Sequence, residues 1–250
     1  MIQRIEHGPI LELNLSRPPA NALSPELIAL ILQSVREAPS AGAQGLVLSG
    51  QPGIFSGGLD VPDLLGRSRE EMAQTWTDFF ALLEALAKSP VPIAAAVTGH
   101  SPAGGAVMTL FGDRRFMAEG PFKIGLNEVQ VGLPMPPVIY RGVERLVGPR
   151  HAERLSVGGL LIPGEEALAV GLVDELAPVD EVVPRAVAWV ESLLAMPRQA
   201  MLETRQLARA DLCVLFDGPL DLDPFVDRWF SDETQGAMRA MVARLAEKRG

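Results

Sequence analysis

The chain is poor in cysteine and in positive charge. Cys213 is the single cysteine among 250 residues, which excludes an intrachain disulfide and any cysteine-based zinc site. The 22 lysines and arginines are outnumbered by 31 aspartates and glutamates, so the formal charge is −9. This balance argues against a broad nucleic-acid surface. The positive charge that binds an anionic ligand would have to come from a few lysines or arginines near its site.

Long apolar runs are also missing. The longest, such as "PIAAAV", fall far short of the ~20 residues that a membrane span needs. The opening "MIQRIEHG" contains Glu6 and lacks the apolar stretch of a signal peptide. We therefore expect a soluble, cytoplasmic protein that does not contact membranes. Apolar residues make up 48% of the chain, enough for one large domain, or for one domain with a helical extension.

Strand and helix patterns alternate in the first half of the chain. Leu11, Leu13 and Leu15 alternate with Glu12 and Asn14, which predicts a half-buried strand. Buried strands are expected at 45–50 and near 92–97, and helices after the cap Ser24-Pro25 and over 69–88. This alternation predicts an α/β architecture with parallel or mixed pairing. Later helices are predicted over 150–157, 164–170, 183–195, 197–211 and 232–248, with a brief interruption at 171–176.

The stretch "GHSPAGGAVM" at 99–108 follows a buried strand and allows two interpretations. A nucleophile elbow has the form G-x-S-x-G, but here Ala103 replaces the last glycine and Pro102 removes the N–H after Ser101. Alternatively, Gly104 and Gly105 open a helix whose free N–H groups could hold an anion or an oxyanion. Close helix–strand packing would also explain the two glycines.

Another glycine-rich loop, "FSGGLD" at 55–60, also follows a buried strand and precedes a possible helix, "VPDLL". Two such loops could direct two N–H donors at one oxygen. The loop lacks the Gly-Lys-Ser/Thr ending of a phosphate-binding P-loop. The glycine spacing of a dinucleotide-binding fold is absent as well.

Glu128 lies within "FKIGLNEVQVGLP", 122–134, among apolar residues. Burial there would raise the pKa of the carboxyl group, which suits a general base near neutral pH. Alternatively, Glu128 faces solvent on a short segment. The pattern alone leaves both interpretations open.

Taken together, these stretches resemble the crotonase superfamily, the enoyl-CoA hydratase/isomerase family. The resemblance covers nearly the whole chain. It is carried by "LSRPPANALSPEL" (15–27), "LVLSGQPGIFSGGLD" (46–60), "IAAAVTGHSPAGGAVMTLFGDRRFM" (93–117) and "AVGLVDEL" (169–176). "SPAGG" and "IGLNEVQVG" are similar to the mitochondrial-type Δ3,Δ2-enoyl-CoA isomerase branch.

The resemblance implies a spiral of repeated ββα units over 1–195 and a C-terminal helical region over 196–250 that builds a homotrimer or a dimer of trimers. It also implies an acyl-CoA thioester as substrate, with no metal and no cofactor. The backbone N–H groups of Leu59 and Gly104 would hold the thioester oxygen. The further ligand contacts that it implies are Ser56, Gly57, Gly58, Asp60 and Asn127, although Ser56 and Asp60 could instead stabilise their loop.

The family's hydratases use two glutamates. The resemblance places one at Val107, which can neither accept nor donate a proton, and the other at Glu128. A single carboxylate suits an isomerase that takes a proton from C2 of a 3-enoyl-CoA and returns it at C4. Arg17, Lys248 and Arg249 are candidate contacts for the CoA phosphates.

Four alternatives remain open. The same enolate could serve another crotonase-type reaction on an acyl-CoA. A residual hydratase would need an acid from Asp60 or Asp63. A non-catalytic acyl-CoA-binding subunit would keep the ligand site without turnover. A serine hydrolase would use Ser101 with His151, the only histidine that follows it.

Overall fold

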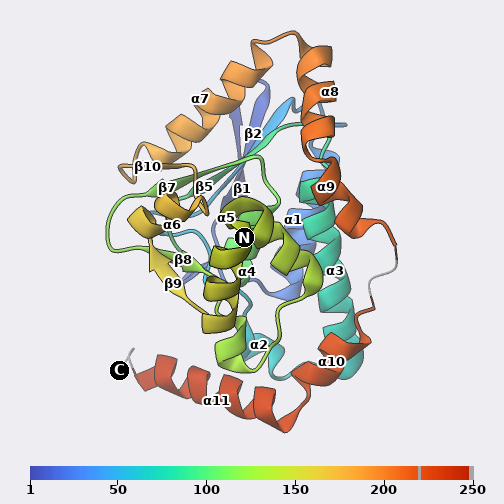
Figure 1. Ribbon diagram of the computed structural model, residues 1–250, viewed down its shortest axis with the longest axis vertical. Helices are drawn as coiled ribbons and strands as arrows, with labels where there is room; N and C mark the ends of the chain where they lie inside the picture. The colour runs from blue at the N-terminus through green and yellow to red at the C-terminus, as the bar shows by residue number, and fades with distance from the viewer. Residues whose placement is uncertain (219–220, 248–250) are drawn as a thin grey trace.

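Within residues 1–218 and 221–247, the part of the chain that the computed structural model describes, ten strands form two sheets (Figure 1). The larger sheet has the order β1-β2-β3-β5-β7-β10 and the smaller one the order β4-β6-β8-β9. The strands are β1 (Ile2–His7), β2 (Ile10–Leu15), β3 (Gly45–Ser49), β4 (Gly53–Ile54), β5 (Ile93–Val97), β6 (Gly99–Pro102), β7 (Arg114–Ala118), β8 (Lys123–Gly125), β9 (Leu161–Pro163) and β10 (Glu175–Ala177).

Strand pairing repeats one unit along the chain. The hairpin β1–β2 and the pair β8–β9 are antiparallel, whereas the other neighbours run parallel. β3, β5 and β7 of the larger sheet are each followed directly by β4, β6 and β8 of the smaller one, and then by helical turns. The predicted ββα repeat is therefore present. It brings the loops after β4, β6 and β8 to one side of the small sheet.

The helical segments begin where sequence signals predict them in several cases. Ser24 caps the first helix by accepting a hydrogen bond from the Leu27 N–H, and Ser68 and Glu71 form a capping box. The segments are α1 (Pro25–Glu37), α2 (Val61–Leu64), α3 (Arg69–Ala87), α4 (Gly104–Leu110), η1 (Glu128–Val131), α5 (Pro137–Gly158), α6 (Gly164–Val170), α7 (Val182–Leu194), α8 (Arg198–Ala208), α9 (Ala210–Cys213), η2 (Val214–Phe216), α10 (Asp223–Trp229) and α11 (Asp232–Glu247).

The larger sheet is buried on both faces. Leu46 and Leu48 of β3 belong to the main core, whereas Val47 packs in a second cluster with α7. The prediction that β2 is half-buried was wrong, because Glu12 is only 3% exposed. Its carboxylate accepts a hydrogen bond from Ser49 Oγ at 2.5 Å and pairs with His7 Nε2 at 2.8 Å. These partners, supplied by neighbouring strands, allow a carboxylate to be buried there.

One helix departs from the predicted pattern. The helix expected over 150–157 begins much earlier, at Pro137, and its backbone breaks at Gly148 (φ +72°, ψ 165°) ahead of Pro149. The stretch at 171–176 interrupts the helices as predicted and contains the start of β10. The predicted division at residue 195 falls between α7 and α8. In Figure 1 the segments α8 to α11 run from the top of the molecule down one side and along its lower edge.

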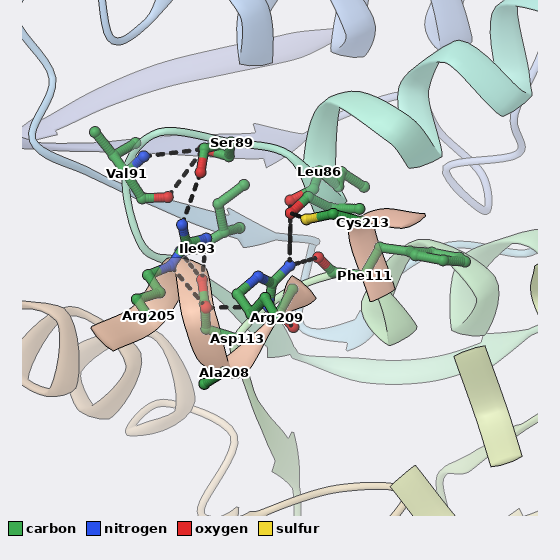
Figure 2. Close-up of polar contacts among 12 residues, drawn as sticks. Leu86, Ser89, Val91, Ile93, Phe111, Asp113, Arg205, Ala208, Arg209 and Cys213 are labelled. Carbon is green, nitrogen blue, oxygen red and sulfur yellow. Dashed lines mark hydrogen bonds and ion pairs between the residues drawn. The ribbon is translucent and has the colours of Figure 1, made fainter. Parts of the chain in front are cut away.

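An ion-pair cluster fastens α8 and α9 to the rest of the fold (Figure 2). Asp113 accepts two hydrogen bonds of 2.8 Å from Arg205, one of 3.0 Å from Arg209, and one of 2.7 Å from the Ile93 N–H. Arg209 also donates to the Phe111 carbonyl at 2.7 Å. The cluster is almost fully buried, so these charges are screened little by solvent.

Candidate active site

A cavity of about 480 Å³ lies where the two glycine-rich loops, the segment after β8 and the last two helices meet. Most of its wall is apolar, with Trp76 and Phe79 of α3, Trp229 of α10 and Met238 and Met241 of α11. The charged side chains among the described lining residues are Arg17, Asp60 and Glu128. A larger hollow of about 990 Å³, beside α8 and α9, is lined by none of the predicted site residues.

The first of the two glycine-rich loops along the chain, residues 55–60, presents a backbone N–H donor at Leu59. Leu59 pairs with Leu23 in an isolated parallel bridge, in which the Leu23 N–H donates to the Gly58 carbonyl at 2.8 Å. The Asp60 N–H donates to the Leu23 carbonyl at 3.1 Å. The N–H of Leu59 itself has no partner among the described residues, and Leu59 lines the cavity.

The second glycine-rich loop, which lies between β6 and α4, presents another N–H donor at Gly104, the first residue of α4. This N–H has no intrahelical acceptor, because the first amides of a helix lack one, and no other described residue accepts from it. The preceding Ala103 has φ +48° and ψ −125°, a conformation that L-residues rarely adopt and that costs strain. This turn aims the start of α4 at the cavity.

The two donors are neighbours in space. A Cβ built on Gly104 would lie 3.6 Å from the Leu59 nitrogen, and one built on Gly58 would lie 3.4 Å from the Gly104 nitrogen. Gly58 has φ +80°, which favours glycine. A Cβ on Gly105 would come within 2.9 Å of the Ser56 carbonyl oxygen, so this glycine lets the two loops touch. The result is a pair of neighbouring N–H groups, neither of which has an acceptor among the described residues.

Glu128 lines the same cavity, at the first position of η1. Its Oε2 atom is buried and has no hydrogen-bond partner among the described residues. Burial raises the pKa of Glu128 to about 7, although a hydrogen bond from its own backbone N–H acts in the opposite direction. The carboxyl group can therefore be both a base and, once protonated, an acid near neutral pH.

Residues 6–212 match the sequence profile of the enoyl-CoA hydratase/isomerase family. The chain is 33% identical to the human mitochondrial enoyl-CoA delta isomerase 1 over 238 residues, covering 93% of this chain and 79% of that protein. It is 32% identical to a probable enoyl-CoA hydratase of Mycobacterium avium over 208 residues, covering 82% of this chain and 78% of that protein.

The crystal structure of human mitochondrial delta3-delta2-enoyl-CoA isomerase superimposes with a TM-score of 0.93 at 30% identity. The match covers 100% of this chain and 99% of that one. The chain belongs to the enoyl-CoA hydratase/isomerase family. The resemblance and the crotonase-like fold predicted from the sequence are thus confirmed.

The cavity is lined by most, but not all, of the residues that the family resemblance singled out. Gly57, Leu59, Asp60, Gly104, Asn127 and Glu128 all line it. Gly58 instead packs against the second loop. Ser56 is fully buried, and its hydroxyl donates to the Asn21 carbonyl at 2.8 Å and accepts from the Gly58 N–H at 3.2 Å. Ser56 therefore stabilises its loop, which is the alternative that the sequence left open.

The serine-hydrolase interpretation lacks an accessible nucleophile. Ser101 is fully buried in β6, does not line the cavity, and its Oγ has no partner among the described residues. Val107, which the family resemblance places at the position of the hydratases' first glutamate, is buried and lines the cavity. The cavity wall is therefore apolar at that position.

The first loop is held in place by the segment over 17–24, a role that was not predicted from the sequence. Asn21 adopts φ +49° and its side-chain amide donates to the Phe55 carbonyl at 3.1 Å. The Ala20 carbonyl accepts from the Gly57 N–H at 2.7 Å. The signal was present in "RPPANAL", where an asparagine tolerates a positive φ, but its partner lies more than 30 residues away.

One of the three basic residues predicted to contact the CoA phosphates lines the cavity. Arg17 lines the cavity and pairs with Asp60 at 2.7 Å. Lys248 and Arg249 lie outside the described residues. Over the described ranges, no helix is long and apolar enough to cross a membrane, and no cluster of three or more potential metal-ligating side chains occurs.

Proposed function

We propose that the chain isomerises 3-enoyl-CoA thioesters to 2-enoyl-CoA, with Glu128 as the single proton carrier. The observation that supports this proposal is the Glu128 carboxyl group, whose pKa is about 7 and whose Oε2 has no hydrogen-bond partner among the described residues. It lines the same apolar cavity as Leu59 and Gly104, whose N–H groups have no acceptor within that part of the chain. The similarity to the human enzyme named enoyl-CoA delta isomerase 1 agrees with it.

In the proposed first step, the thioester carbonyl oxygen accepts hydrogen bonds from Leu59 and Gly104. Glu128 takes a proton from C2, and the electrons of the broken C–H bond form an enolate whose negative charge rests on that oxygen. One such donor contributes roughly 100- to 1,000-fold in rate. The amino end of α4 adds its positive dipole.

In the proposed second step, the protonated Glu128 returns the proton to C4. The oxygen's negative charge re-forms the thioester C=O bond, and the C1–C2 π electrons of the enolate become the new C2–C3 double bond. The C3–C4 π bond breaks and its electrons take the proton to form the C4–H bond, which gives the conjugated thioester and restores the carboxylate. Neither water nor an external acid enters the balance, so no metal or redox cofactor is proposed. A pKa near neutrality suits a group that accepts and then donates a proton.

A hydratase needs a second acid, and the two candidates for it are engaged elsewhere. Asp60 pairs with Arg17 at 2.7 Å, and Asp63 pairs with Arg67 at 3.0 Å. The isomerase proposal is therefore preferred to the hydratase alternative. We also propose the homotrimer or dimer of trimers, because the amphipathic helix α8 leaves the apolar Leu207 largely exposed in this chain.

The test is proton NMR of a short 3-enoyl-CoA with wild type, Glu128→Gln and the exposed control Glu153→Gln. We expect the vinyl signals to move to the conjugated position with wild type and the control, and turnover with Glu128→Gln to fall by at least ~100-fold. If Glu128→Gln turns over normally, the single-base mechanism is wrong. If the wild type binds the thioester without turnover, the protein is an acyl-CoA-binding subunit.

A further inference from the structure

Asp60 places a carboxylate beside the oxyanion donors. It follows Leu59 directly in the chain and lines the same cavity. Its structural use is clear, because its side chain caps α2 by accepting from the Asp63 N–H, at 3.5 Å. A negative charge at this position opposes an enolate. Two like charges ~8 Å apart at an effective dielectric constant of ~20 would slow enolate formation by about thirtyfold.

Arg17 compensates for that charge. Its Nη2 lies 2.7 Å from Asp60 Oδ2, and both side chains are largely shielded, with exposures of 28% and 13%. The other terminal nitrogen of the guanidinium donates to the Ala22 carbonyl at 3.1 Å, and the Arg17 backbone N–H donates to Asn21 Oδ1 at 2.8 Å. The guanidinium is thus fixed in place by contacts within the segment over 17–24.

We propose that Arg17 is a positioning residue that neutralises the charge of Asp60 and holds its carboxylate against the segment over 17–24. The carboxylate can then cap α2 and anchor the loop without opposing negative charge on the thioester oxygen. This role differs from a contact with the CoA phosphates, because Arg17 acts through Asp60. The inference rests on the proposed function, since it concerns the enolate of that reaction.

The electrostatic role makes the two halves of the pair unequal. Removing the charge of Arg17 leaves Asp60 facing the enolate, whereas removing the charge of Asp60 leaves a cation that favours it. If the ion pair had a purely structural role, removing either charge would break the same contact, and both single variants would lose activity equally. A phosphate contact would depend on Arg17 alone and would change binding rather than turnover.

The experiment measures kcat and KM for Arg17→Gln, Asp60→Asn and the double variant. For Arg17→Gln we expect kcat to fall about thirtyfold and KM to change less than about threefold; for Asp60→Asn, kcat should fall less than about fivefold. Adding Asp60→Asn to Arg17→Gln should restore kcat to the level of Asp60→Asn alone. Arg185→Gln and Glu181→Gln, which break an exposed ion pair on α7, should leave both parameters unchanged.

Equal losses in the two single variants without recovery in the double variant would overturn the inference. So would a raised KM with unchanged kcat for Arg17→Gln. If Arg17→Gln does not fold, Arg17→Lys keeps the charge. Its kcat should stay within about fivefold of wild type, and a thirtyfold loss would contradict the electrostatic role.

A second reaction separates this inference from the proposed function. Exchange of the C2 protons of butanoyl-CoA in D₂O, followed by NMR, reports enolate formation without double-bond movement, and the variants should rank as they do for kcat. A wild type that exchanges but does not isomerise would refute the isomerase proposal and still test Arg17. A wild type that does neither refutes both.

Discussion

The burial of Glu128 makes turnover depend on pH in a defined way. Because the proposed base must be ionised, kcat/KM should fall on the acid side of the pKa of the free enzyme, which is about 7. At pH 6 only about one tenth of the enzyme would carry the ionised base, so kcat/KM should be roughly tenfold below its plateau. With the ordinary pKa of 4.5, almost nothing would be lost at that pH.

The assay follows initial rates of 3-enoyl-CoA isomerisation between pH 5 and 9 at constant ionic strength. Circular dichroism at each pH verifies that the protein remains folded, so that unfolding is not mistaken for titration. A plateau that extends down to pH 5.5 would refute the argument. It would mean that the Glu128 carboxylate is hydrated or paired in solution, or that another group is the base.

The same burial predicts a stability difference with a definite sign. Since the pKa of Glu128 is raised in the folded state, the native protein binds this proton more tightly than the unfolded chain. Stability is therefore lost as the pH rises from about 4.5 to about 7, and the full loss persists above pH 7. The difference between 4.5 and about 7 is equivalent to about 3 kcal/mol. Urea unfolding should show Glu128→Gln more stable than wild type by up to ~3 kcal/mol at pH 8.5, and by less than ~1 kcal/mol at pH 5.

Three further substitutions test the packing around the site and the anchoring of α8. Gly105→Ala should lower the free energy of unfolding by ~1–3 kcal/mol and reduce turnover, because its Cβ would meet the Ser56 carbonyl at 2.9 Å; wild-type values for both would contradict the packing described. Ser101→Ala removes a buried hydroxyl that has no described partner, so urea unfolding should show unchanged or slightly higher stability, and turnover should persist. Asp113→Asn should lower the free energy of unfolding in the same assay by about 3–5 kcal/mol, because Arg209 loses its buried counter-charge. The control Arg185→Gln, which breaks an exposed ion pair, should lower it by less than ~1 kcal/mol.

The parts of the site that rest on local patterns could be predicted from the sequence. Both glycine-rich loops follow buried strands, and Glu128 stands out as an acid among apolar residues. These signals need only a few neighbouring residues. The same holds for the helices that begin at Ser24 and Ser68, whose caps lie within one turn.

What could not be predicted depends on contacts between distant segments. Asn21 holds the first loop through Phe55, and Glu12 is buried because Ser49 and His7 satisfy it. The two-residue strand β4 is too short to give any periodic signal. Whether Glu128 faces solvent or the cavity depends in part on the packing against η1 of α11, which begins more than 100 residues further along the chain.

The donors at Leu59 and Gly104 belong to the backbone, and this affects how the chain tolerates mutation. A substitution of the leucine side chain leaves the amide in place, so missense variants at this position are expected to be mild, with proline the exception because it has no N–H. The sensitive positions are instead glycines that bear no functional group. A survey of random variants screened for activity should therefore find its inactive members enriched at Gly58 and Gly105, whereas most substitutions of Leu59 other than proline should remain active.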